Sequence, residues 1–132
     1  MKKFELTPDM VSLGGAFYPR GYVFVMFANG EDAAQVAREI DQNPDSAVML
    51  LDPATIERDI GKVSGDSAVP LPSVGTEGAT VTKYVQLARD GHHALMAKVS
   101  SDEDAERVMA AARKVSFSYG QRYRLLVIED LE

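Results

Sequence analysis

One run of eight residues decides the fold class of this chain: Arg20-Gly21-Tyr22-Val23-Phe24-Val25-Met26-Phe27. β-branched and aromatic residues dominate the run, and such residues suit a pleated, buried strand. Successive side chains of a strand point to opposite faces. One face of the predicted strand therefore carries Tyr22, Phe24 and Met26, and the other carries Val23, Val25 and Phe27.

A helix is predicted directly after this strand. Asn29 is a good N-cap, and an apolar face recurs at helical spacing through Ala33, Val36, Ala37 and Ile40. A second buried strand follows at residues 47–51.

The same order returns 72 positions later. Glu31-Asp32-Ala33 aligns with Glu103-Asp104-Ala105 (103 − 31 = 72), and at this offset the first strand aligns with a strand predicted over 92–99. The repeat predicts two βαβ halves, and hence an α+β fold: a ferredoxin-like βαββαβ sandwich with a four-stranded antiparallel sheet. The last strand is expected over 123–128. We expect strands 20–27 and 92–99 in the middle of the sheet, helices on one face and an open second face.

The chain length predicts a single domain, residues 1–132. Its segments are a lead-in (1–19) with a short helix from Pro8 to Leu13, a first half with a short helix (20–61), a loop (62–75), and a helix with the second half (76–132). The helices over 53–61 and 76–90 are extra helices between the two halves. Residues 117–121 are interpreted as a connector and 129–132 as an acidic tail.

Composition narrows the classes of function. The net charge is −6, which counts against nucleic-acid binding, and the absence of Cys excludes disulfides, Cys-bound zinc and thiol catalysis. The N-terminus lacks the apolar core of a signal peptide, and no apolar run has the length of a membrane span. We therefore expect a cytoplasmic protein with no membrane partner.

The sequence offers no motif for catalysis, so the hypothesis leans towards a protein that is not an enzyme. His92 and His93 are adjacent on a strand and point to opposite faces, so the two cannot chelate one metal ion together. Residues 75–80 open a helix that could hold a phosphate, but no Lys follows Gly78, so the segment is not a P-loop. We predict no metal, no cofactor and no catalytic residue.

The run at residues 20–27 resembles the conserved octapeptide of the RNA recognition motif at every fixed position except Val23. The resemblance implies that Tyr22 and Phe24 stack on bases, with Arg20 as a phosphate contact. The alternative interpretation is that these residues form an ordinary buried central strand with no role in RNA binding.

The helix start at residues 101–108 is similar to that of small uncharacterised bacterial proteins of the general-stress-related kind, which implies a fold and a cytoplasmic setting but no activity.

Besides a small-molecule enzyme or sensor with its site between the sheet face and the loop at 62–75, two hypotheses for function remain. In the first, the protein is a non-enzymatic binding or assembly module that forms a homodimer through its open sheet face. In the second, the same face binds single-stranded RNA. The candidate binding residues for both are Arg20, Tyr22, Phe24, Met26, His92, Met96, Lys98, Arg122 and Arg124.

Overall fold

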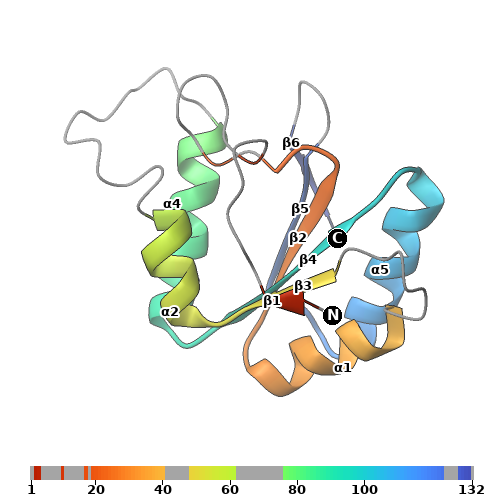
Figure 1. Cartoon of the computed structure of the whole chain (residues 1–132), viewed down its shortest axis with the longest axis horizontal. Coiled ribbons are helices and arrows are strands. Elements are labelled where there is room, and N and C mark those ends of the chain that lie inside the picture. Colours follow the sequence, from red (N-terminus) through yellow and green to blue (C-terminus); the bar gives the residue numbers. More distant parts are fainter. Residues whose placement is uncertain are drawn as a thin grey trace.

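A six-stranded β-sheet packed between two layers of helices forms the fold in the computed structural model of the chain (Figure 1). The structure describes residues 2–3, 10, 17, 19–40, 48–61, 76–123 and 128–131. From one edge of the sheet to the other, the strands are β1 (Lys2–Lys3), β3 (Val48–Leu51), β4 (His93–Lys98), β2 (Tyr22–Phe27), β5 (Tyr119–Tyr123) and β6 (Ile128–Asp130).

Antiparallel pairing holds the four inner strands together. β2 pairs with β4 on one side and with β5 on the other, and β4 also pairs with β3. β6 adds an antiparallel strand next to β5, and β1 pairs parallel with β3. The predicted α+β class and the four-stranded antiparallel sheet are therefore confirmed, as is the central position of the two repeated strands.

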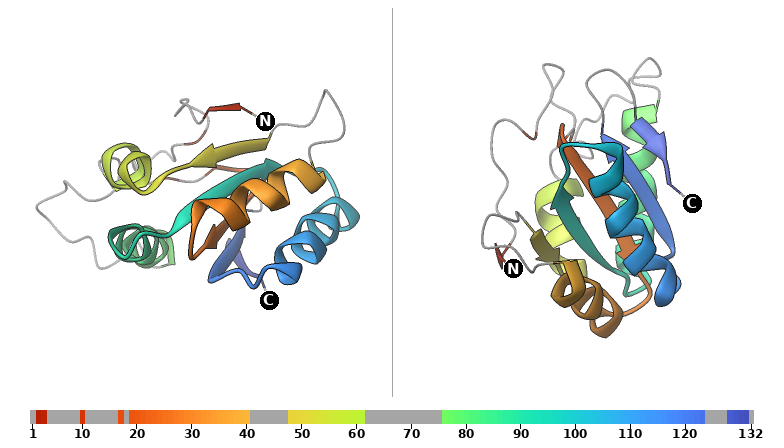
Figure 2. Two further views of the ribbon diagram at one scale, coloured as in Figure 1. Left: turned by 90° about the horizontal axis from the view of Figure 1, so that it is seen from below. Right: turned by 90° about the vertical axis from the view of Figure 1, so that its right-hand side faces the viewer.

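The helices lie in two layers, one on each face of the sheet (Figure 2). The first layer consists of α1 (Gly30–Ile40) and α5 (Asp102–Lys114). The second consists of α2 (Pro53–Thr55), which continues into the π-helical turn η2 (Ile56–Ile60), and α4 (Thr76–Arg89).

The layer of α1 and α5 covers the sheet face that carries Val23, Val25 and Phe27, the face expected to lie beneath helices. Val23, Val25 and Phe27 are fully buried there. The apolar faces of the two helices also match at the offset of 72, because Ala33, Val36, Ala37 and Ile40 share this core with Ala105, Val108, Met109 and Ala112. The predicted cores of both halves are confirmed.

The expectation of an open second face is wrong. Phe24, Met26 and Met96 are 0% exposed, in a second core that lies beneath α4 and η2. The physical reason is in the two helices between the halves. Each of these helices has one apolar face, which must pack against another element to leave water. The sheet face with Phe24, Met26 and Met96 is that element, and the helix residues packed on it include Ile56, Ile60, Val81, Tyr84 and Ala88.

Other expectations differ in detail or cannot be compared. Strand β5 begins at Tyr119, so part of the connector expected over 117–121 already pairs with β2 in the sheet. Most of the strand expected over 123–128 lies outside the described residues, as do the loop at 62–75 and the lead-in helix apart from Met10. None of the described helices is long and apolar enough to cross a membrane.

Candidate functional site

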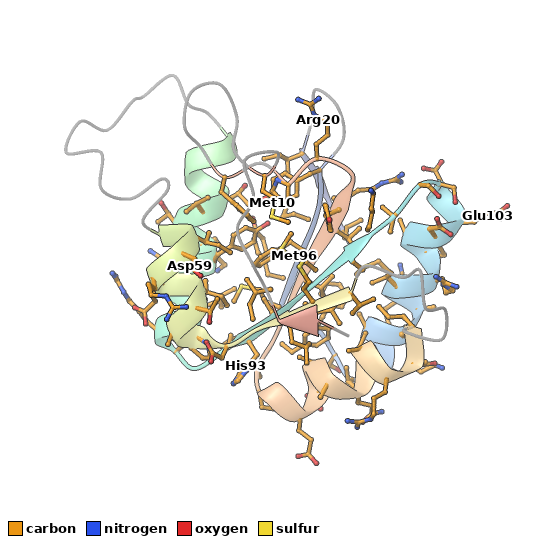
Figure 3. All side chains as sticks on the ribbon, viewed as in Figure 1. Met10, Arg20, Asp59, His93, Met96 and Glu103 are labelled. Carbon is orange, nitrogen blue, oxygen red and sulfur yellow. The ribbon has the colours of Figure 1, made fainter. Side chains whose placement is uncertain are left out.

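A tight turn leads the chain into β2 and places Arg20 at the end of the sheet. Gly21 has φ +86°, a left-handed conformation that favours glycine, and its N–H donates to the carbonyl of Tyr123 at 2.9 Å. The Gly21 carbonyl accepts a hydrogen bond from Val99 N–H at 2.9 Å. Gly21 therefore joins three chain segments at this end of the sheet, where Arg20 is exposed (Figure 3).

The inner part of the octapeptide is covered by the chain's own aromatic residues. The ring of Tyr84 from α4 stacks on Phe24 with a centroid distance of 4.0 Å and an interplanar angle of 27°. Phe17 meets Phe24 edge-on at 5.9 Å. A base could not stack on Phe24 in this arrangement, because Tyr84 already occupies that position.

Three of the predicted binding residues remain at least partly accessible. Arg20 and Lys98 are exposed, and Tyr22 is half-buried. Tyr22 and Lys98 are direct cross-strand neighbours on β2 and β4, so their side chains lie on the same face of the sheet. Neither Arg20 nor Lys98 forms a salt bridge with a residue that the structure describes. We call Arg20, Tyr22 and Lys98 the β2 patch.

The remaining predicted residues do not join the β2 patch. Arg122 lies opposite Val23 on the face covered by α5, where its side chain is 12% exposed and donates to Asp102 Oδ1 at 2.7 Å. Arg124 lies outside the described residues. Phe24, Met26 and Met96 are inside the second core.

The offset of 72 also aligns Arg20 with His92 and predicts that the two residues lie side by side, and this prediction is wrong. Tyr22 pairs with Lys98 and Phe27 pairs with His93, so the two repeated strands run antiparallel. Phe24 and Met96, which correspond in the repeat, pair directly at the middle, whereas corresponding residues at the strand ends lie at opposite ends of the strand pair. His92 is at the far end from Arg20, where its Nδ1 lies 2.8 Å from Oγ of Ser118.

His93 has a packing role at that same end. Its imidazole ring lies so close to the first residue of α1 that a Cβ on Gly30 would be 2.8 Å from its Cε1 atom. Figure 3 shows His93 at the end of the sheet where α1 begins. No group of three His, Asp or Glu side chains within the described ranges could hold a metal ion.

Two carboxylates at helix starts have a lowered pKa. Hydrogen bonds from Thr55, including one from its N–H at 2.7 Å, lower the pKa of Asp52 at the start of α2. The hydroxyl and N–H of Ser100 donate to Asp104 and lower the pKa of this carboxyl in the first turn of α5. Both shifts result from helix capping rather than from a catalytic arrangement.

Sequence reasoning missed two arrangements that bring distant residues together. Tyr84 and Tyr123 share a buried hydrogen bond between their hydroxyl oxygens at 2.7 Å. The second arrangement is the pair of His92 and Ser118, which are 26 positions apart. The one local signal for the pair was Gly91, which follows α4 and thereby sets where His92 leads the chain into β4. Comparison with protein-family models, curated proteins and solved structures gave no match.

Proposed function

We propose that this protein is a non-enzymatic binding module whose contact surface is the β2 patch, and that its partner is single-stranded RNA. The observation that carries the proposal is a half-buried Tyr22 that lies directly across the strands from exposed Lys98 and two positions after exposed Arg20, with neither cation in a salt bridge to a described residue. An aromatic ring can stack on a base of any identity, and neighbouring cations can contact the phosphates. A cytoplasmic setting is part of this proposal.

The resemblance of residues 20–27 to the RNA-binding octapeptide supports this choice of partner, in a reduced form. Tyr22 occupies one of the two stacking positions of that motif and is half-buried, whereas Phe24 occupies the other and is fully covered. A single stacking position and a net charge of −6 both favour weak binding, and the contribution of the two cations falls as salt rises.

We also propose that the core belongs to the ferredoxin-like architecture. The strand order β3-β4-β2-β5, with α1 following β2 and α5 following β4, supports this assignment. The order separates the two strands of each βαβ half by a strand of the other half, as in a split βαβ arrangement.

Fluorescence anisotropy with a labelled oligouridine at low salt tests the binding proposal. We expect weak binding whose affinity falls as salt rises, and a loss of about 1–3 kcal/mol on Tyr22→Ala, the usual contribution of one stacked base. Arg20→Ala and Lys98→Ala should each weaken binding and reduce the salt dependence.

Lys83→Ala is the matched control, because it removes an exposed positive charge from α4 and leaves the β2 patch intact. If Lys83→Ala weakens binding as much as Lys98→Ala, the attraction is not located at the β2 patch. If the wild-type protein does not bind at low salt, the proposed RNA partner is wrong.

Self-association is the second candidate function. Three partly exposed apolar residues, Val115, Phe117 and Leu131, lie at the border of the core beneath α1 and α5, and Leu131 lies against Gly120. An apolar patch buried against the same patch of a second copy is the common basis of a homodimer. Light scattering over a range of concentrations tests this candidate. Phe117→Ser should shift a dimer towards monomer, and a wild-type monomer at every concentration would contradict it.

A further inference from the structure

A histidine and a serine meet where β4 and β5 begin. The Nδ1 atom of His92 lies 2.8 Å from the Oγ atom of Ser118, and the serine is exposed to solvent. We propose that His92 activates Ser118 as a nucleophile, so that the chain accepts an acyl group on this serine from a small acyl phosphate. This is a modification site at the opposite end of β2 from the β2 patch, and it does not depend on the proposed binding function.

The backbone on the histidine side of the pair is fixed by the end of α4. Gly91 has φ +92° and its N–H donates to the carbonyl of Ala88 at 2.9 Å, while His92 N–H donates to the carbonyl of Leu87 at 3.0 Å. These two hydrogen bonds form a Schellman motif, which ends a helix through a left-handed glycine. The motif holds the backbone of His92 in one place relative to α4.

The backbone on the serine side is fixed by the sheet. Ser118 N–H donates to the carbonyl of Met26 at 2.8 Å, and the next residue begins β5. Ser116, two positions earlier, has φ +62°, so the chain turns sharply before it enters the strand. Because both backbones are anchored, the distance between the two side chains does not depend on a flexible loop.

The pair is also available for reaction. Among the described residues, neither the His92 ring nor the Ser118 hydroxyl has a second hydrogen-bond partner. In the tautomer that carries its proton on Nε2, Nδ1 of His92 accepts the hydrogen bond from the serine hydroxyl. A serine hydroxyl is a weak nucleophile alone, and an adjacent base within hydrogen-bond distance is the usual means of activating it.

The proposed step is a single acyl transfer. Oγ of Ser118 attacks the carbonyl carbon of the acyl phosphate while Nδ1 of His92 takes the hydroxyl proton. The bond between that carbon and the phosphate oxygen then breaks, and inorganic phosphate leaves with the bonding electrons. The products are a serine ester at residue 118, an imidazolium at His92 that returns its proton to solvent, and phosphate. No oxidation or reduction occurs.

Acetyl phosphate is the probe, and peptide mass spectrometry measures the rate of acetylation at each site. Ser101 is the internal control, because it is an exposed serine whose Oγ accepts a hydrogen bond from Asp104 N–H and has no imidazole beside it. We expect Ser118 to be acetylated on the order of 10²-fold faster than Ser101, the low end of the effect of a positioned general base. An ester at Ser118 is removed by neutral hydroxylamine, whereas an amide on a lysine is not.

Two variants separate basicity from simple exposure. His92→Gln retains a hydrogen-bonding side chain but lacks a base, and it should lower the rate at Ser118 to the rate at Ser101. Ser118→Ala should abolish the hydroxylamine-sensitive acetylation at residue 118. Circular dichroism checks that both variants are folded. Equal rates at Ser118 and Ser101 in the wild-type protein, or an unchanged rate in His92→Gln, would overturn the proposal.

Discussion

Buried Tyr84 and Tyr123 provide the clearest energetic test of a single contact. Their hydroxyl oxygens are 2.7 Å apart, and both side chains are at most 1% exposed. We expect Tyr84→Phe to lower the free energy of unfolding by about 1 kcal/mol, because it removes one buried hydrogen bond. Denaturant unfolding measures the change.

The double variant Tyr84→Phe, Tyr123→Phe completes this test. Each single variant leaves one buried hydroxyl without the other hydroxyl of the pair, whereas the double variant replaces both tyrosines with apolar rings of the same shape. The double variant should therefore lose less stability than the sum of the two single losses. Additive losses would show that the hydroxyl pair has no coupling energy.

Gly30 is a second position where one side chain decides the outcome. Alanine is intrinsically better than glycine in a helix, yet a Cβ at this residue would be 2.8 Å from Cε1 of His93. We expect Gly30→Ala to destabilise the fold by about 1–3 kcal/mol, the usual range for overpacking. Thermal unfolding measures this, and combination with His93→Ala should restore part of the loss. If Gly30→Ala raises the melting temperature, the ring moves aside easily.

At the scale of the element, α5 depends on its first turn. Ser101 caps the helix by accepting a hydrogen bond from Asp104 N–H at 3.1 Å. Loss of such a cap costs about 1 kcal/mol, so Ser101→Ala should be destabilised by about that amount, whereas Ser101→Asp should remain close to wild type. Equal losses in both variants, measured by chemical denaturation, would contradict a capping role.

Asp104 makes the stability of the same element depend on pH. Hydrogen bonds from Ser100 hold the pKa of this carboxyl below its usual range in the folded protein. A lowered folded-state pKa contributes stability that is present above the unfolded-state pKa and is lost as the pH falls through the folded-state pKa. We therefore expect the melting temperature of wild type to exceed that of Asp104→Asn at neutral pH, and the difference to shrink below about pH 4. A difference that stays constant with pH would contradict this.

The elements also show how much of the fold the sequence could predict. The faces of β2 and the apolar stripes of α1 and α5 follow from periodicity within single segments, and burial confirms them. The cover over Phe24 could not be found in this way, since it depends on which surface Tyr84 packs against. Periodicity identifies an apolar face, but it does not identify the partner of that face.

The same limit applies to the candidate site, because the sequence predicts the face of a residue but not its neighbours in space. Tyr22 and Lys98 were predicted on one face of the sheet and are direct cross-strand neighbours, because residue spacing within each strand fixes the face of its side chains. His92 was placed at the wrong end, since an internal repeat gives equivalent residues but not the direction in which the strands pair. Its contact with Ser118 needs the three-dimensional fold.

For the whole molecule, the position of β2 predicts where the structure is most resistant to opening. This strand bonds to β4 and β5 on its two edges and is covered on both faces. We expect the amides of β2 and β4 to exchange hydrogen only through global unfolding, and those of β6 at the sheet edge to exchange faster. Hydrogen-exchange mass spectrometry measures both, and exchange of β2 as fast as that of β6 would contradict the prediction.

The pairing of β2 with β5 also has a consequence for protein synthesis. Phe24 pairs with Gln121, which is 97 positions later in the chain (121 − 24 = 97). A ribosome therefore exposes β2 long before it has made the strand that completes one of its edges. Contacts of such long sequence separation form late, and an unpaired apolar strand is prone to aggregation in the meantime. The nascent chain must keep β2 from aggregating with other molecules until the residues of β5 have left the ribosome.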